Sequence, residues 1–331
     1  MGGVPRDPTT GNMLDTHEIN SLFSSKGAES DELSLSVLWD FGRAPHEAPA
    51  TARTADIAAP WLSGSWDGST VCNLFALAKK VKHTGAPGTF LPAQWQPEGT
   101  CVGRGCSGLL NHLQFSRILA NPDLYQEWKP VSHAWCYAGA RMQYNMLHDR
   151  SFGAVGKGAL EWCHAKGVCY QEEVGDTNYR SDKLAGDWAY SGIPSTLIPL
   201  GADNLVDDSA LVTTCDQVAD LLARGGGITV ASNQGFTMTR DSDGFCSPRG
   251  SWAHQMWIGS VGKFGPRQRK GFGCCQSWDQ NVPSGPTIDN HPDNVFGIYW
   301  DVLQRMLNAR DSMGAWVFHG WEKKLDWGAL S

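Results

Sequence analysis

The sequence predicts an α+β fold in which a helical lobe precedes a lobe of antiparallel strands. Before residue 225 the apolar residues recur at helical spacing, and after it they occur in short runs or alternate with polar residues. At about 150 residues per domain, 331 residues suffice for one large domain or two lobes. Two lobes of different composition are expected to meet at a cleft, where binding sites commonly form.

Three helices are predicted in the first lobe. Residues 107–119 carry leucines at helical spacing, and the following Asn-Pro pair ends the pattern. Ser132 can cap a second helix that runs to about residue 147. A third helix covers about 154–166 and ends at Gly167, because glycine accepts the backbone conformation that terminates a helix.

The second lobe is predicted to open with one further helix and to continue as strands. Thr214 and Gln217 have the spacing of a capping box, which opens a helix that stops at the three glycines 225–227. The strands are predicted from β-branched or alternating residues, at 228–232, 251–261 and 272–278.

Residues 1–55 differ from the rest in being rich in Pro, Ala, Thr, Ser and charged side chains. We expect them to form an N-terminal arm that docks onto the protein or a partner, and residues 56–331 to form the folded domain. Within that domain we expect the helical lobe at about 88–200 and the β-rich lobe at about 205–320.

Charge and hydropathy exclude several classes of protein. The 27 Lys and Arg against 34 Asp and Glu give a net charge of −7, which argues against a nucleic-acid-binding surface. No apolar run approaches the roughly 18 residues of a membrane span, and residues 1–10 lack the apolar segment of a secretory signal. These features fit a protein of the cytoplasm and equally a component of a larger particle.

The ten cysteines show neither a disulfide framework nor a zinc ribbon, because their spacing is irregular and no pair of C-x-x-C motifs occurs. We expect most of them to be small buried side chains, and we expect no metal or cofactor. Five residues are candidate metal ligands by type, but their spacing matches no standard zinc site: His133, Cys136, Cys163, His164 and Cys169.

One cysteine has surroundings suited to nucleophilic chemistry. Cys101 follows a Gly-Thr turn and directly precedes a predicted helix, whose N-terminal partial positive charge favours a thiolate. Backbone N–H groups at this turn can hold an oxyanion, and Gln94 or Gln96 can add a side-chain donor. Far downstream, His254 on a predicted strand supplies a base, and Gln276 supplies an amide to orient it.

This order of residues resembles the papain-like (C1) cysteine peptidases, above all their divergent bacterial and phage-encoded members. The resemblance covers roughly residues 88–320 and rests on three motifs: Gln94-Trp95-Gln96-Pro97-Glu98-Gly99-Thr100-Cys101-Val102-Gly103, Trp252-Ala253-His254 and Gln276-Ser277-Trp278-Asp279. It implies the papain-like two-lobe fold, a helical lobe followed by an antiparallel β-rich lobe, with the active-site cleft between them.

The resemblance also implies roles. Cys101 would be the nucleophile, His254 the general base and acid, and Gln276 the residue that orients the imidazole. Trp278 would shield the bond between His254 and Gln276 from water. Either Gln94 or Gln96 would complete the oxyanion hole, because the family's position six residues before the nucleophile is Trp95 here. Cys106 competes for the nucleophile's role, but it lies inside the helix and lacks the bulky residue that follows the family's nucleophile.

Two further departures concern Gln276, where the family has Asn, and Asp279, where it has Gly. We therefore keep two functions. The first is a peptidase that hydrolyses amide bonds of a protein or a peptidoglycan peptide through a thioester acyl-enzyme. The second is a structural or virion-associated protein that retains the fold with weak or no catalysis and contacts phage structural proteins through residues 1–55. Neither involves nucleic acid or a membrane.

Overall fold

The structure is a computed structural model that describes residues 66–82, 85–122, 127–149, 152–176, 181–202, 206, 208–278, 282–316, 325 and 327. The predicted arm, residues 1–55, lies outside this part of the chain, so its role stays a prediction.

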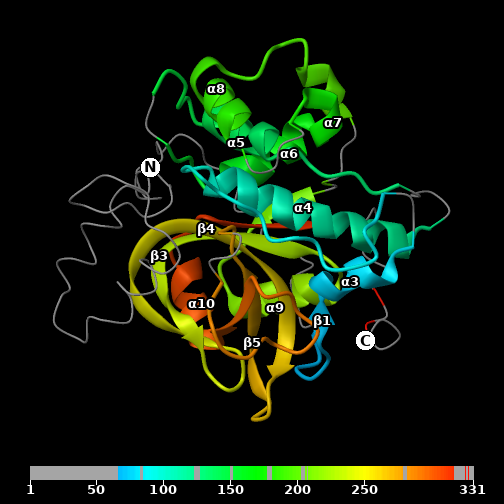
Figure 1. The fold of residues 1–331 in the computed structure, drawn as a ribbon, viewed down its shortest axis with the longest axis vertical. Helices are drawn as coiled ribbons and strands as arrows, with labels where there is room; N and C mark the ends of the chain where they lie inside the picture. Colours follow the sequence, from blue (N-terminus) through cyan, green and yellow to red (C-terminus); the bar gives the residue numbers. More distant parts are fainter. Residues whose placement is uncertain are drawn as a thin grey trace.

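Helices make up one lobe of the molecule (Figure 1). Its central element is the long helix α4, and α5, α6 and α8 lie on the side of α4 that faces away from the sheet. The elements of this lobe are α4 (Cys101–Ala120), α5 (His133–Gln143), α6 (Gly158–Lys166), α7 (Gln171–Val174), α8 (Lys183–Ser191) and the 3-10 helix η2 (Ile198–Ala202).

The other lobe is an antiparallel sheet, in which seven strands pair among the described residues. Their order is β2-β7-β3-β4-β5-β6, and β1 pairs with a further stretch of β4. The strands are β1 (Cys72–Asn73), β2 (Asp208–Leu211), β3 (Gly227–Arg240), β4 (Cys246–Phe264), β5 (Arg269–Cys275), β6 (Val295–Tyr299) and β7 (Ser312–Trp316).

Three more helices pack close to the sheet: α3 (Leu74–Lys80), α9 (Cys215–Ala223) and α10 (Trp300–Leu307). Helix α9 begins with the predicted capping box, in which the Thr214 side chain accepts the N–H of Gln217 and the Gln217 side chain accepts the N–H of Thr214. The chain thus has the predicted α+β architecture, with helices in one lobe and antiparallel strands in the other.

Helix α4 lies close to its neighbours because small residues face them. A Cβ atom added to Gly103 would lie 2.4 Å from the carbonyl oxygen of His133 in α5. A Cβ on Gly108 would lie 2.8 Å from the indole nitrogen of Trp257 in β4. These contacts hold α4 between α5 and the sheet, and they outweigh the low helix propensity of glycine.

The limits of several elements differ from the prediction. Helix α4 starts at Cys101 and not at residue 107, because close packing supports a glycine-rich first turn that apolar periodicity cannot detect. Helix α5 stops at Gln143, since Asn145 takes a left-handed conformation with φ 52°. Strand β5 ends at Cys275, so Trp278 lies in the segment beyond it.

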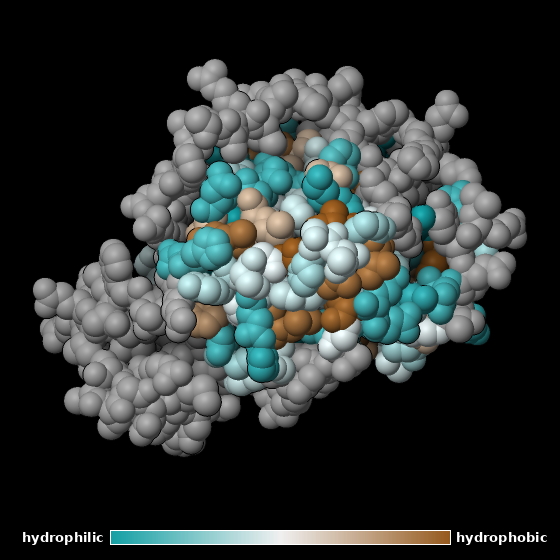
Figure 2. Space-filling view, turned by 90° about the horizontal axis from the view of Figure 1, so that it is seen from above, coloured by the Kyte–Doolittle hydropathy of each residue, from teal (hydrophilic) through white to brown (hydrophobic). Residues whose placement is uncertain are grey.

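Seen from above the helical lobe, apolar side chains gather in the middle of the described surface and hydrophilic side chains surround them (Figure 2). Among the described residues no helix combines the length and the apolar character that a membrane crossing requires.

Candidate active site

Cys101 is the first residue of α4, and Thr100 is the N-cap. The Thr100 side chain makes no capping bond to the helix, so the first N–H groups of α4 are left for other partners. Cys101 is 7% exposed. Burial raises the pKa of Cys101, whereas the backbone groups of Gln255 and Val102 act in the opposite direction.

His254 lies on β4, directly before Gln255, and pairs with Ser232 of β3. The side-chain Nε2 of Gln255 donates to the carbonyl of Val102 at 3.3 Å, and this bond brings the start of α4 against the strand that carries His254. His254 is 3% exposed, and burial lowers its pKa to about 3. Neither ring nitrogen has a hydrogen-bond partner among the described residues. At neutral pH Cys101 is thus a thiol and His254 a neutral imidazole.

Trp278 covers one face of that imidazole. The two rings are stacked, with centroids 4.7 Å apart and planes inclined by 24°. Trp252 meets both rings edge-on, at 4.9 Å from Trp278 and 6.3 Å from His254. The aromatic enclosure excludes water from the imidazole and accounts for the lowered pKa. The role predicted for Trp278, shielding a hydrogen bond between His254 and Gln276, stays a prediction.

Gln276 is close to these residues but is bonded differently from the prediction. The side-chain oxygen of Gln276 accepts the backbone N–H of Trp278. The backbone N–H of Gln276 donates to the backbone carbonyl of Asn294. In the described part of the chain no hydrogen bond joins Gln276 to His254. The extra methylene of glutamine lets the amide fold back onto its own segment, so its orienting role stays a prediction.

The two candidate oxyanion donors occupy different places. Gln96 is buried, and its Oε1 accepts the hydroxyl of Ser277 at 2.6 Å. Gln94 donates instead to Ser107 at 3.4 Å, and Ser107 lies six residues into α4, about 9 Å along its axis from Cys101. The structure therefore joins Gln96, and not Gln94, to the segment that carries Gln276 and Trp278.

A buried carboxylate supports the turn in front of Cys101. Asp182 Oδ2 accepts the hydroxyl of Thr100 at 2.6 Å and the N–H of Glu98 at 3.2 Å. Its Oδ1 lies 2.5 Å from Nη2 of Arg104 and 3.1 Å from Nε2 of His133. Burial alone would raise the pKa of Asp182, but the His133 imidazole and the Arg104 charge bring it down to about 2.

The network of polar contacts extends from His133 to a second buried carboxylate, Asp176. Nδ1 of His133 lies 3.0 Å from Asp176, which also accepts the hydroxyl of Ser132 at 2.7 Å. These side chains fix α4, α5 and the start of α8 relative to one another. Sequence reasoning gave Asp182 no role, because it belongs to no linear motif. It placed Ser277 in the motif with Gln276 and Trp278 but did not predict its bond to Gln96, which is distant in sequence.

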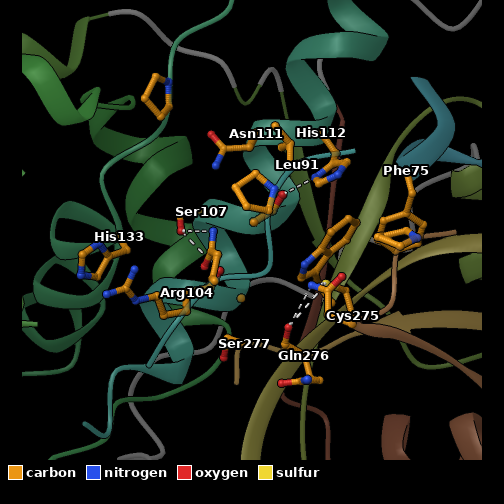
Figure 3. A pocket seen from close by; sticks show the side chains of 18 of the residues that line it. Phe75, Leu91, Arg104, Ser107, Asn111, His112, His133, Cys275, Gln276 and Ser277 are labelled. Atoms are coloured by element: carbon orange, nitrogen blue, oxygen red, sulfur yellow. Dashed lines mark hydrogen bonds between the residues drawn. The ribbon is translucent and has the colours of Figure 1, made fainter. Parts of the chain in front are cut away.

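A cavity of about 170 Å³ lies between α4 and the sheet. In Figure 3, side chains of α4 such as Arg104, Ser107 and His112 face Cys275, Gln276 and Ser277 across it. Gln94 and Gln255 also line the cavity, whereas Cys101 and His254 do not. The two lobes thus meet where the prediction placed the cleft, and the cavity lies beside the candidate pair.

All ten cysteines are within the described residues, and all are free and buried, as expected for most of them. Cys106 has no exposed surface, and its sulfur lies with those of Cys136 and Cys163 inside the helical lobe. This position, away from the strand of His254, favours Cys101 over Cys106 as the candidate nucleophile.

Comparisons with known proteins were made on sequence and on structure. No protein-family model and no curated protein matches the chain. Among solved structures, xylellain, a cysteine protease from Xylella fastidiosa, aligns over 76% of this chain and 87% of its own, with 14% identity and a TM-score of 0.50. Digestive procathepsin L 3 of Tenebrio molitor larval midgut aligns over 87% and 79%, with 12% identity and a TM-score of 0.51.

The chain has a papain-like fold. The predicted two-lobe architecture is thereby confirmed. At these identities the likeness shows the fold alone, and the roles of individual residues rest on the geometry above.

Proposed function

We propose that this papain-like protein is a cysteine peptidase that hydrolyses amide bonds in peptides or proteins with Cys101 as its nucleophile. One observation carries the proposal: Gln255, which directly follows His254, donates its side-chain N–H at 3.3 Å to the carbonyl of Val102, the residue after Cys101 at the start of α4. This arrangement supplies a nucleophile, a neutral base and helix N-terminal donors in one place.

The proposed reaction starts from the neutral pair. As the Cys101 sulfur attacks the substrate carbonyl carbon, its proton passes to His254. The N–H of Cys101 and Nε2 of Gln96 hold the developing oxyanion. The His254 imidazolium then protonates the leaving amine, the C–N bond breaks, and a thioester remains. In the second half His254 takes a proton from the water that attacks the thioester carbon. The C–S bond then breaks, and His254 returns the proton to the sulfur as the carboxylic acid leaves.

A specific observation favours a second candidate. The oxygen of Gln276 is occupied by the N–H of Trp278, and the imidazole of His254 has no orienting partner among the described residues. Loss of the orienting group weakens a catalytic histidine severely. The alternative is therefore a binding or structural protein that keeps the fold with little or no catalysis. A virion-associated form of this role, acting through residues 1–55, stays a prediction on which no described residue bears.

The two candidates are separated by labelling and turnover. Purified protein is incubated with an epoxide inhibitor of cysteine peptidases, the adduct is located by mass spectrometry, and hydrolysis of a mixed peptide library is followed in parallel. We expect the adduct on Cys101 and loss of hydrolysis in Cys101→Ala. Cys106→Ala, five residues further along the same helix, is the matched control. This variant should still form the adduct on Cys101 and hydrolyse the library.

Hydrolysis that is equal in the wild type and Cys101→Ala would refute the peptidase proposal. A folded wild type that neither hydrolyses the library nor takes up the epoxide would favour the second candidate. Peptides from peptidoglycan cross-bridges, included in the library, distinguish the two substrate classes that the sequence leaves open.

A further inference from the structure

Three cysteines from three helices meet in the interior of the helical lobe. Cys106 belongs to α4, Cys136 to α5 and Cys163 to α6, and none has any exposed surface. All three sulfur atoms lie within 4.8 Å of one another, and those of Cys136 and Cys163 are 3.7 Å apart. This cluster has no part in the proposed peptidase chemistry.

The spacing of the sulfurs suits a shared metal ion. A metal–sulfur bond of about 2.3 Å places the three sulfurs of a planar three-coordinate site about 4 Å apart. The Cys136–Cys163 separation of 3.7 Å is close to this value and the other two are at most 4.8 Å, so small side-chain shifts would complete the site. A disulfide would instead require two sulfurs to approach to about 2.05 Å and would leave the third thiol alone.

The donor set determines the class of ion. Among the described residues the group contains only sulfur donors, and no histidine nitrogen or carboxylate oxygen joins it. Zinc in structural sites takes four ligands almost without exception, and calcium and magnesium require oxygen. Soft thiolate ligands suit copper(I), zinc and iron–sulfur clusters, but such clusters, like structural zinc, take four protein ligands. Copper(I) accepts three.

We propose that Cys106, Cys136 and Cys163 form a three-coordinate thiolate site for copper(I). The site lies five residues along α4 from Cys101, about 7.5 Å along the helix axis, and does not depend on whether Cys101 is catalytic. The bound ion ties α4, α5 and α6 together, and binding displaces protons from the thiols. Because its ligands come from three separate helices, the site has no linear spacing that a sequence pattern could reveal.

The test uses the full chain carrying Cys101→Ser, so that the candidate nucleophile cannot bind the ion. The reduced protein is titrated anaerobically with copper(I) held by a chromophoric chelator. We expect one equivalent to pass to the protein, and X-ray absorption to report three sulfur ligands at a single distance. Replacement of Cys106, Cys136 or Cys163 by Ser should abolish the transfer.

Cys169→Ser is the matched control, because Cys169 is equally buried in the same lobe and lies outside the cluster. Transfer should be unchanged in this variant. Its loss there, or its persistence in the three cluster variants, would overturn the proposal, as would the absence of any transfer. If the serine variants do not fold, the copper-bound protein is alkylated in mild denaturant instead. Copper should then protect the thiols of Cys106, Cys136 and Cys163 from alkylation and leave the other cysteines reactive.

Discussion

The hydroxyl of Ser277 donates to Oε1 of Gln96 at 2.6 Å, and this bond joins the segment before α4 to the segment after β5. It fixes the orientation of the amide, since an amide whose oxygen accepts a hydrogen bond presents its NH₂ as the donating end. Both side chains are buried, so the arrangement is held away from competing water. This relationship separates Gln96 from Gln94, which the sequence alone could not do.

The first prediction follows from that bond. Replacing Gln96 by Ala should lower kcat by about 100-fold with little change in KM, because an oxyanion donor acts mainly in the transition state. Gln94→Ala, two positions earlier and bonded to Ser107, is the matched control and should retain near-normal turnover. Steady-state kinetics on one peptide substrate checks both, and equal losses would refute the assignment to Gln96.

The second prediction concerns the pH dependence of kcat/KM. The base must be neutral to take the thiol proton, and burial lowers the pKa of His254 to about 3. Burial also raises the pKa of Cys101, so the thiol persists through neutral pH. We expect kcat/KM to stay flat from about pH 5 to pH 8, measured in short assays. An acid limb near the ordinary histidine pKa of about 6.5 would contradict the buried neutral pair.

A third prediction tests whether Asp182 positions the nucleophile. Asp182→Asn and Asp176→Asn each remove a buried charge beside His133, and each should lower the free energy of unfolding by about 3–5 kcal/mol. Only Asp182 holds the hydroxyl of Thr100, next to Cys101. Alkylation of Cys101 below the melting temperature should therefore slow in Asp182→Asn and not in Asp176→Asn. Equal slowing would show that the effect is one of stability alone.

These relationships mark what could be read from the sequence and what could not. The order of Cys101, His254 and Gln276 along the chain, the capping box at Thr214 and the change from helical to strand periodicity are local signals, and they predicted the fold class and the candidate residues. The start of α4 was missed because its glycines are favoured only by the close approach of α5 and of the sheet. The contacts of Ser277 and Asp182 were missed because the identity of a single polar residue does not indicate which distant residue it contacts.

The fourth prediction is loss of stability in mild acid. Burial lowers the pKa of His112 and His291 to about 4 and that of His254 to about 3. Below about pH 6.5 the unfolded chain binds protons at these three positions and the folded chain does not. The free energy of unfolding should therefore fall as pH drops from about 6.5 towards 4, by about 1.4 kcal/mol per pH unit for each histidine.

Urea unfolding at several pH values gives this slope, and calorimetry in two buffers gives the proton uptake independently. Replacing His254 with Gln should reduce the dependence of the unfolding free energy on pH by about 1.4 kcal/mol per pH unit, the contribution of one histidine. A stability that does not change between pH 6.5 and 4 would show that the three imidazoles are not kept neutral by burial.

The last prediction compares two helical glycines with opposite surroundings. Alanine favours a helix over glycine by about 0.5–1 kcal/mol, so Gly186→Ala in α8 should stabilise the protein by that amount, since the new Cβ meets only a carboxylate oxygen of Glu98 at 4.0 Å. At Gly139 in α5 the Cβ would lie 2.1 Å from the ring of Trp162, which is buried and packed against Trp135. The indole cannot move without disturbing that pair, so Gly139→Ala should destabilise the protein by about 1–3 kcal/mol. Denaturant unfolding of both variants measures the two shifts, and stabilisation by Gly139→Ala would mean that α5 and α6 are less closely packed than the structure shows.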